Sequence, residues 1–97
     1  MAHHVILMNF TEQGAKTVKD TVKRYQAAKA AAAKNGVTFK DVYWLQGKYD
    51  LVVIVESANE EGATMLGLGV AAQGNVRTQT MRAFTEGEMS AILAKLG

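Results

Sequence analysis

Two short stretches of this chain are apolar at almost every position. Residues 4–10 and 50–56 have the length of strands, and odd and even positions are apolar in both. Successive side chains of a strand point to opposite faces of a sheet, so a strand with one solvated face alternates apolar and polar residues. These two strands do not alternate. The sequence therefore predicts that both faces of the sheet are covered.

One copy of the chain has too few residues to cover both faces of the sheet. Surface scaling for 97 residues predicts burial of about 64% of the unfolded surface, which supports one small core and one domain over residues 1–97. The predicted helix at 58–73 is also apolar round most of its circumference. The economical interpretation is a homo-oligomer with sheets packed face to face across a two-fold axis. The alternative is a monomer whose C-terminal helix folds over the open sheet face.

Periodicity and caps predict four strands and three helices. In chain order they are strand 4–10, helix 13–35, strand 37–45, strand 50–56, helix 58–73, strand 76–84 and a short C-terminal helix. Asn35-Gly36 ends the first helix, while Ser57 with Glu60 and Thr85 with Glu88 match capping boxes. This βαββαβ order is an α+β, ferredoxin-like sandwich with strand order 4-1-3-2.

The sequence of the first predicted helix indicates one buried, apolar side and one charged side. Its apolar stripe is expected at Ala15, Val18, Val22, Tyr25 and Ala28 or Ala32. Between residues 16 and 34 the only acidic residue is Asp20, whereas six residues are basic: Lys16, Lys19, Lys23, Arg24, Lys29 and Lys34. Such a stripe can bind nucleic acid, but the charged face has no interleaved aromatic residues and no recognised motif. We interpret it as a solvated helix face.

Composition restricts the chemistry that is open to the chain. The sequence has no cysteine, which removes disulfides, thiolate nucleophiles and Cys-ligated metals. No apolar run approaches the roughly 20 residues that span a bilayer, and no signal peptide is recognised, so a cytoplasmic protein is expected. The sequence specifies no cofactor.

The predicted topology brings the end of the first strand and the starts of the third and fourth strands to one sheet edge. This edge is the candidate ligand site, made of Asn9, Tyr43, Trp44, Tyr49, Asp50, Asn75 and Arg77. Aromatic walls with a carboxylate, amides and a guanidinium suit a small, anionic or aromatic molecule. The alternative is structural, with Arg77 paired to Asp50 and the other polar groups serving turns.

Two further motifs carry weaker signals. His3 and His4 are expected at the opposite edge, with His4 near Glu56 and Arg82, but they have no third metal ligand at a fixed spacing and lie where chains often fray. No metal site is predicted. Gly67, Gly69 and Ala72 fit a dinucleotide-binding pattern only on paper, because they lie late in a helix. The helix glycines are expected to permit close packing.

The predicted hairpin carries a family resemblance. The stretch Val42 to Val52 contains Gly47, Tyr49 and Asp50 and resembles the signature of the GYD-domain family, and segments 7–11 and 74–84 agree with it. The resemblance implies a ferredoxin-like fold of the dimeric alpha-beta barrel type. Relatives of that barrel include cofactor-independent monooxygenases, isomerases, haem-binding enzymes and ligand-sensing domains, so fold analogy does not choose a function.

Three hypotheses follow from these residues. The first is a homo-oligomeric module that binds or senses a small molecule at the candidate edge. The second is a cofactor-independent enzyme, monooxygenase- or isomerase-like, that uses Asp50 or a histidine as general base. The third gives Gly47, Tyr49 and Asp50 purely structural roles in the hairpin.

Overall fold

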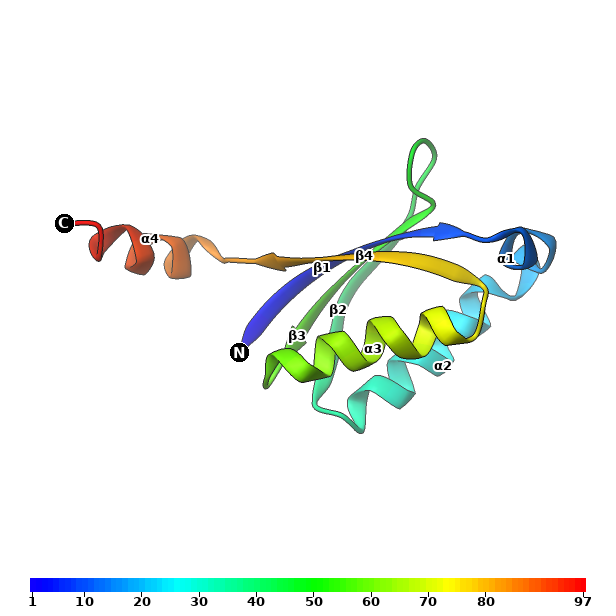
Figure 1. The fold of residues 1–97 in the computed structure, drawn as a ribbon, viewed down its shortest axis with the longest axis horizontal. Helices are drawn as coiled ribbons and strands as arrows, with labels where there is room; N and C mark the ends of the chain where they lie inside the picture. The colour runs from blue at the N-terminus through cyan, green and yellow to red at the C-terminus, as the bar shows by residue number, and fades with distance from the viewer.

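The computed structural model describes residues 1–97 and contains one four-stranded antiparallel sheet with helices (Figure 1). The elements in chain order are β1 (Ala2–Phe10), α1 (Glu12–Lys16), a 3₁₀ turn (Val18–Asp20), α2 (Thr21–Ala33), β2 (Val37–Trp44), β3 (Leu51–Ser57), α3 (Glu60–Ala72), β4 (Val76–Ala83) and α4 (Glu86–Ala94). The strand order is β2-β3-β1-β4. The predicted α+β, ferredoxin-like fold is confirmed. None of the helices combines the length and the apolar character that a bilayer-crossing segment needs.

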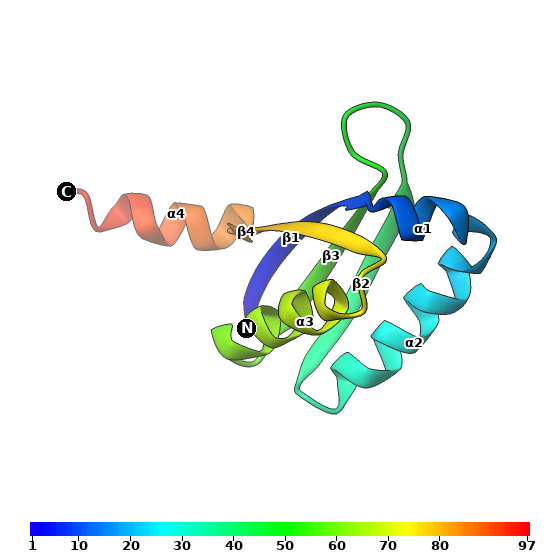
Figure 2. The ribbon, with the colours of Figure 1, turned by 45° about the vertical axis from the view of Figure 1, so that its right-hand side comes forward.

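Helices α2 and α3 cover one face of the sheet (Figure 2). The core lies between them and the sheet, and its buried residues are Ile6, Met8, Ala32, Val37, Phe39, Leu51, Val53, Val55 and Leu66. In β3 the buried positions alternate strictly with half-buried ones. One face of the sheet is therefore closed by this chain's own helices.

The other face, which we call the open face, carries no helix. Val5 lies opposite Ile54 on β3 and opposite Met81 on β4, and Leu7 lies opposite Val52. Directly opposed residues share a face, so these five apolar side chains form one patch. The predicted division of both strands into two apolar faces is confirmed, and only one face is covered within the chain.

Helix α4 does not cover the open face. It continues beyond the end of β4 and projects away from the sheet and from α2 and α3 (Figures 1 and 2). The capping box that was predicted at its start is present: the Glu88 amide donates to Thr85 Oγ1 at 3.1 Å, and the Thr85 amide donates to Glu88 Oε1 at 2.8 Å. The monomer in which the C-terminal helix folds over the open face is therefore not the arrangement seen.

The predicted single helix over 13–35 is wrong, because the chain breaks near Thr17. The Thr17 hydroxyl donates to the Gln13 carbonyl oxygen at 2.9 Å, and the backbone of Thr17 leaves helical geometry at φ −108° and ψ 30°. Threonine side chains that bond the preceding turn compete with regular helix. Arg24 donates to the carbonyl oxygen and the hydroxyl of Thr17 at 2.8 and 3.0 Å and holds the bend.

This bend also corrects the predicted apolar stripe. Ala15 and Val18 are exposed, because the segment before α2 turns away from the sheet, and Val22 in the first turn of α2 is 50% exposed. Tyr25 and Ala28 pack against the core and Ala32 is buried within it, as predicted.

The start of α3 differs from the predicted capping box. Ser57 is the last residue of β3, is fully buried, and its hydroxyl donates to the Asn59 carbonyl oxygen. The cap is Asn59, whose side-chain oxygen accepts from the Gly62 amide at 2.9 Å. Ser57 matched the motif but remains in the strand, which delays the helix by two residues.

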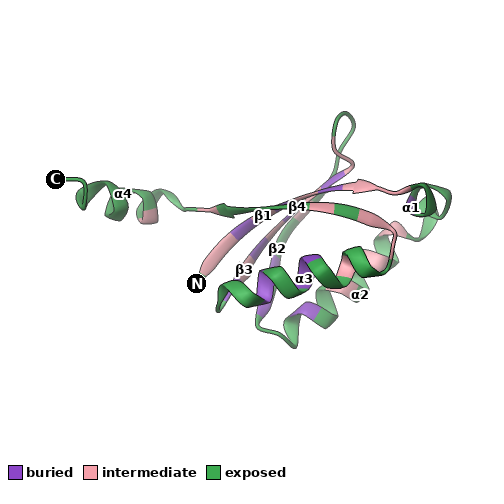
Figure 3. Cartoon of the chain, in the orientation of Figure 1, coloured by how far each residue is buried: buried purple, intermediate pink, exposed green.

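The glycines of α3 differ in their surroundings. A side chain at Gly62 would lie 2.7 Å from Ser57 Oγ and 2.8 Å from Val37 Cγ2, so close packing requires glycine there. Gly69 has nothing within 4 Å, and there the packing interpretation is wrong. Figure 3 shows that much of α3 is exposed, and its exposed residues include Met65 and Leu68, which is 68% exposed.

Candidate functional site

The predicted site residues gather at one end of the sheet, which we call the hairpin end. It contains the end of β1, the β2–β3 loop and the start of β4, and in the register Asn9 lies opposite Arg77. Gly47 in the loop has φ 129°, which favours glycine because it has no Cβ. The predicted side chains share this end, but they point in different directions.

Asp50 has a structural contact. Its Oδ2 accepts a hydrogen bond from the Phe10 amide at 2.8 Å, and its own amide donates to the Met8 carbonyl oxygen at 2.9 Å. The carboxylate thereby extends the pairing of β1 and β3 past the last residue pair of the ladder. Asp50 lines neither the cavity between α2, α3 and the sheet nor the surface depression at the hairpin end. The structure therefore offers no support for its use as a general base. No ion pair joins Asp50 to Arg77.

Asn9, Tyr49 and Arg77 line a shallow depression beside the apolar patch of the open face, together with Leu7, Lys48, Thr78 and Gln79. The Tyr49 hydroxyl lies 2.9 Å from Gln79 Oε1 on β4, so the loop reaches across the end of β1. Asn9 Nδ2 donates to the Lys48 carbonyl oxygen at 2.7 Å. The depression contains two cations and no carboxylate, and the sequence-based prediction had missed Lys48 and Gln79.

Tyr43 and Trp44 separate, because they are neighbours in a strand. Tyr43 lies opposite Val52 and belongs to the open face. Trp44 points to the helix side, where its indole donates to Thr21 Oγ1 at 3.0 Å and packs edge-on against Tyr25 at 5.8 Å. The two rings do not form one aromatic wall, and Trp44 anchors β2 to α2.

Asn75 also belongs to the helix side. Its carbonyl oxygen accepts from the Thr11 amide at 3.0 Å, and its side-chain oxygen accepts from Gln13 Nε2 at 2.9 Å. Gly14 lies so close that a Cβ there would be 1.9 Å from the Asn75 carbonyl oxygen. These contacts dock α1 on the α3–β4 turn, which explains the short helix after β1.

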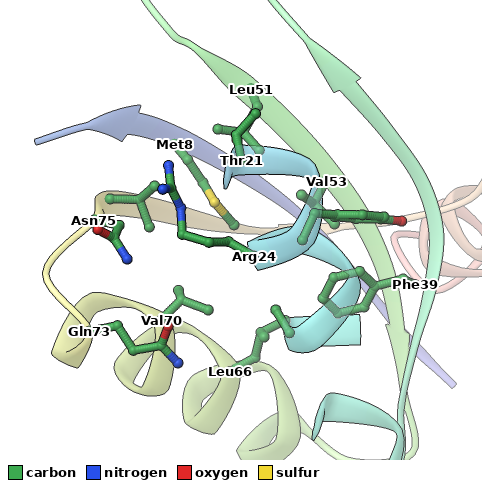
Figure 4. A pocket seen from close by; sticks show the side chains of 13 residues that line it. Met8, Thr21, Arg24, Phe39, Leu51, Val53, Leu66, Val70, Gln73 and Asn75 are labelled. Atoms are coloured by element: carbon green, nitrogen blue, oxygen red, sulfur yellow. The ribbon is translucent and has the colours of Figure 1, made fainter. Parts of the chain in front are cut away.

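A cavity of about 50 Å³ lies between α2, α3 and the sheet (Figure 4). Nine of its thirteen lining residues are hydrophobic, and the polar ones are Thr21, Arg24, Gln73 and Asn75. Of the seven predicted site residues, only Asn75 takes part. The sequence predicts that Arg24 belongs to the solvated face of the helix together with Lys19, Lys23 and Lys29. These three lysines are exposed, and no local sequence signal distinguishes Arg24 from them.

Arg24 carries a charge without an acidic partner. Its guanidinium donates to Thr17 and, at 3.3 Å, to the Gly14 carbonyl oxygen, and it takes part in no ion pair. These bonds use three of the five N–H groups of a guanidinium. Two N–H donors of Arg24 therefore remain without a partner in the chain.

The opposite end of the sheet holds the two histidines in an ordered strand. His3 Nε2 lies 2.9 Å from Glu56 Oε1, and His3 Nδ1 lies 3.5 Å from Glu88 Oε1. Glu56 is thus the neighbour of His3, not of His4 as predicted, while His4 lies opposite Arg82 as predicted. No group of three or more His, Asp or Glu side chains is arranged to hold a metal.

His4 is buried, and no protein group bonds its Nδ1. Burial lowers the pKa of His4 below its ordinary 6.5, and the nearby Arg82 lowers it further, against an opposing contribution from Glu60. The pKa of Glu88 is also lowered, because its carboxylate accepts the backbone hydrogen bond from Thr85. The charged Glu88 is therefore favoured at the start of α4.

Comparison with known families agrees with the hairpin residues. The family model of the GYD domain matches residues 4–93 of this sequence. The chain belongs to the GYD-domain family. This confirms the resemblance seen at Gly47, Tyr49 and Asp50. No curated protein matches the sequence.

Solved structures share the fold of this GYD domain. The crystal structure of MtbAldR has a TM-score of 0.69 at 15% identity and covers 88% of this chain, which spans about half (52%) of that protein. FFRP-DM1 has a TM-score of 0.58 at 22% identity over 87% of this chain and 100% of its own. TTHA0845 from Thermus thermophilus has a TM-score of 0.54 at 26% identity over 88% of this chain and 95% of its own.

Proposed function

We propose that this GYD-domain protein is a homo-oligomeric module that binds a small molecule with an apolar group and an anionic group. The observation that carries the proposal is the cavity between α2, α3 and the sheet, where apolar walls meet Arg24. Ligand pockets combine mostly apolar walls with a few polar groups that fix orientation. Arg24 supplies such a group without a competing carboxylate in the chain.

The cavity size narrows the ligand class. At about 50 Å³ it is much smaller than the roughly 150 Å³ that holds a benzene ring. A short aliphatic chain fits this space better than an aromatic ring. A short-chain aliphatic carboxylate therefore matches this site if its apolar tail enters the cavity and its carboxylate stays outside the apolar walls, beside Arg24.

The homo-oligomer is supported by the open face. Its apolar patch joins strands β1, β3 and β4, and α4 of the same chain leaves it uncovered. A second copy, with its sheet packed face to face across a two-fold axis, would cover it with an equally apolar surface.

A second candidate site is the depression at the hairpin end. Lys48 and Arg77 line it without a carboxylate, and the predicted Asn9 and Tyr49 lie beside them. Two cations with neutral hydrogen-bonding side chains favour an anionic ligand, and here the contact would be at the surface.

NMR titration with butyrate distinguishes the two sites, and butylamine serves as the matched cation with the same carbon chain. We expect butyrate to shift the methyl resonances of Leu66 and Val70, and butylamine to leave them unchanged. Ala28→Leu fills the cavity with a residue of good helix propensity and should abolish these shifts. Arg77→Ala should leave them intact.

Shifts confined to residues 77–79 and lost in Arg77→Ala would instead select the hairpin end. If butyrate and butylamine give equal shifts, the role of Arg24 is wrong. If neither shifts any resonance at millimolar concentration, the carboxylate class is wrong.

A further inference from the structure

Helix α4 presents apolar side chains that its own chain leaves largely exposed. They form a stripe that consists of Met89, Ile92 and Leu93 on α4, spaced as i, i+3 and i+4, and of Leu96 in the turn just beyond the end of the helix. Leu93 is 55% and Leu96 78% exposed, and Figure 3 shows α4 almost wholly exposed. A stripe with this spacing is typical of a helix that packs against an apolar surface.

The direction of α4 is held at its first turn. The capping box joins Thr85 and Glu88, and Glu88 also lies 3.5 Å from His3 Nδ1 on β1. Only Phe84 and Thr85 separate α4 from β4, so the helix follows the line of the strand (Figure 1). Folding back over its own open face would require the contact between His3 and Glu88 to break.

The protruding helix makes the chain more extended than its length predicts. The radius of gyration is 14.5 Å, against about 12.5 Å for a compact domain of this size. With Phe84 added, the exposed apolar residues of this arm present on the order of 500 Å². That is more than half of the roughly 800 Å² that each partner buries in an interface of standard size.

We propose that α4 is an exchanged arm, whose apolar stripe packs against a second copy of this chain along the margin of its open face. The inference rests on the homo-oligomer proposed above. No charged residue lies between Glu88 and Lys95, and the five residues of the open-face patch are uncharged too, so this helix segment and this patch bring no charge of their own into the contact. Each copy has one uncovered arm and one uncovered sheet face. A two-fold dimer would bury both apolar surfaces of each copy in one closed assembly.

Charge substitutions on the two sides of α4 test the arm in the full chain. Ile92→Lys with Leu93→Lys places two charges on the stripe, while Ala91→Lys with Ala94→Lys places two on the opposite, exposed side. Lysine is a good helix former, and cations suit a helix C-terminus. We expect the stripe variant to raise the dimer dissociation constant at least tenfold by light scattering and sedimentation, and the control to change it less than twofold.

A mixed-label NMR experiment locates the contact. Isotope-filtered spectra of a one-to-one mixture of labelled and unlabelled chains should show contacts between the Ile92 and Leu93 methyls of one copy and the other copy. A dimer that lacks these contacts, or in which the stripe variant dissociates like the control, overturns the arm and leaves the sheet-to-sheet dimer standing. A chain that is monomeric at 100 µM overturns both proposals. Circular dichroism and the sheet resonances verify that each variant is folded.

Discussion

Asp50 is predicted correctly in position, and the tertiary structure decides what it does. Sequence and topology place it at the hairpin end, where it was equally compatible with catalysis and with a structural role. Its 2.8 Å bond to the Phe10 amide favours the structural one, because a carboxylate that accepts a backbone N–H replaces a missing partner of the sheet. Arg24 is the converse case. Its sequence neighbours are exposed lysines, and only the bend at Thr17 turns it toward a cavity.

The buried His4 predicts a pH dependence of stability. Its pKa is lower in the folded chain than in the unfolded one, so between the two pKa values the unfolded state binds more protons. Stability should therefore fall as the pH drops below about 6.5 and level off below the folded-state pKa. In urea denaturation between pH 5 and 8, His4→Leu should show a smaller loss toward acid than the natural chain.

His3→Gln is the control, since it removes the neighbouring imidazole and leaves the buried one. It should retain the acid-side loss that His4 causes. An identical pH profile for His4→Leu and the natural chain would refute the assignment.

At the scale of elements, apolar periodicity and cap motifs predict the type and order of every strand and of α3 and α4. They fail where a tertiary contact competes with a local one. Thr17 and Arg24 break the first helix, and Asn59 replaces Ser57 as the cap because Ser57 is held in β3. Local motifs do not reveal such competition, because the competing partner is distant in sequence or is set by sheet pairing.

Two glycines of α3 give a matched prediction. Gly62→Ala should lower the free energy of unfolding by about 1–3 kcal/mol, because its Cβ meets Ser57 and Val37. Gly69→Ala should raise it by about 0.5–1 kcal/mol, because the site is open and alanine is the better helix former. Urea denaturation at one protein concentration measures both. Equal effects of the two substitutions would contradict the packing described for α3.

At the scale of the whole molecule, the open face predicts assembly. Ile54 lies in β3 opposite Val5, and Ile54→Lys would place a charge in the apolar patch. We expect light scattering to give a multiple of 10.5 kDa for the natural chain and 10.5 kDa for Ile54→Lys. Gln26→Lys, on the exposed side of α2, should assemble like the natural chain. A light-scattering mass of 10.5 kDa for the natural chain at micromolar concentration would contradict the prediction.

The sequence by itself determined the strands, their two apolar faces, the strand order and membership of the GYD-domain family. These follow from periodicity and from a contiguous motif, both of which are written in neighbouring residues. Only the tertiary structure decided the bend in the first helix, the cavity beside Arg24 and the outward course of α4. Each of these depends on which groups meet in space, such as Arg24 with Thr17 or His3 with Glu88, and the apolar spacing along the chain does not encode that choice.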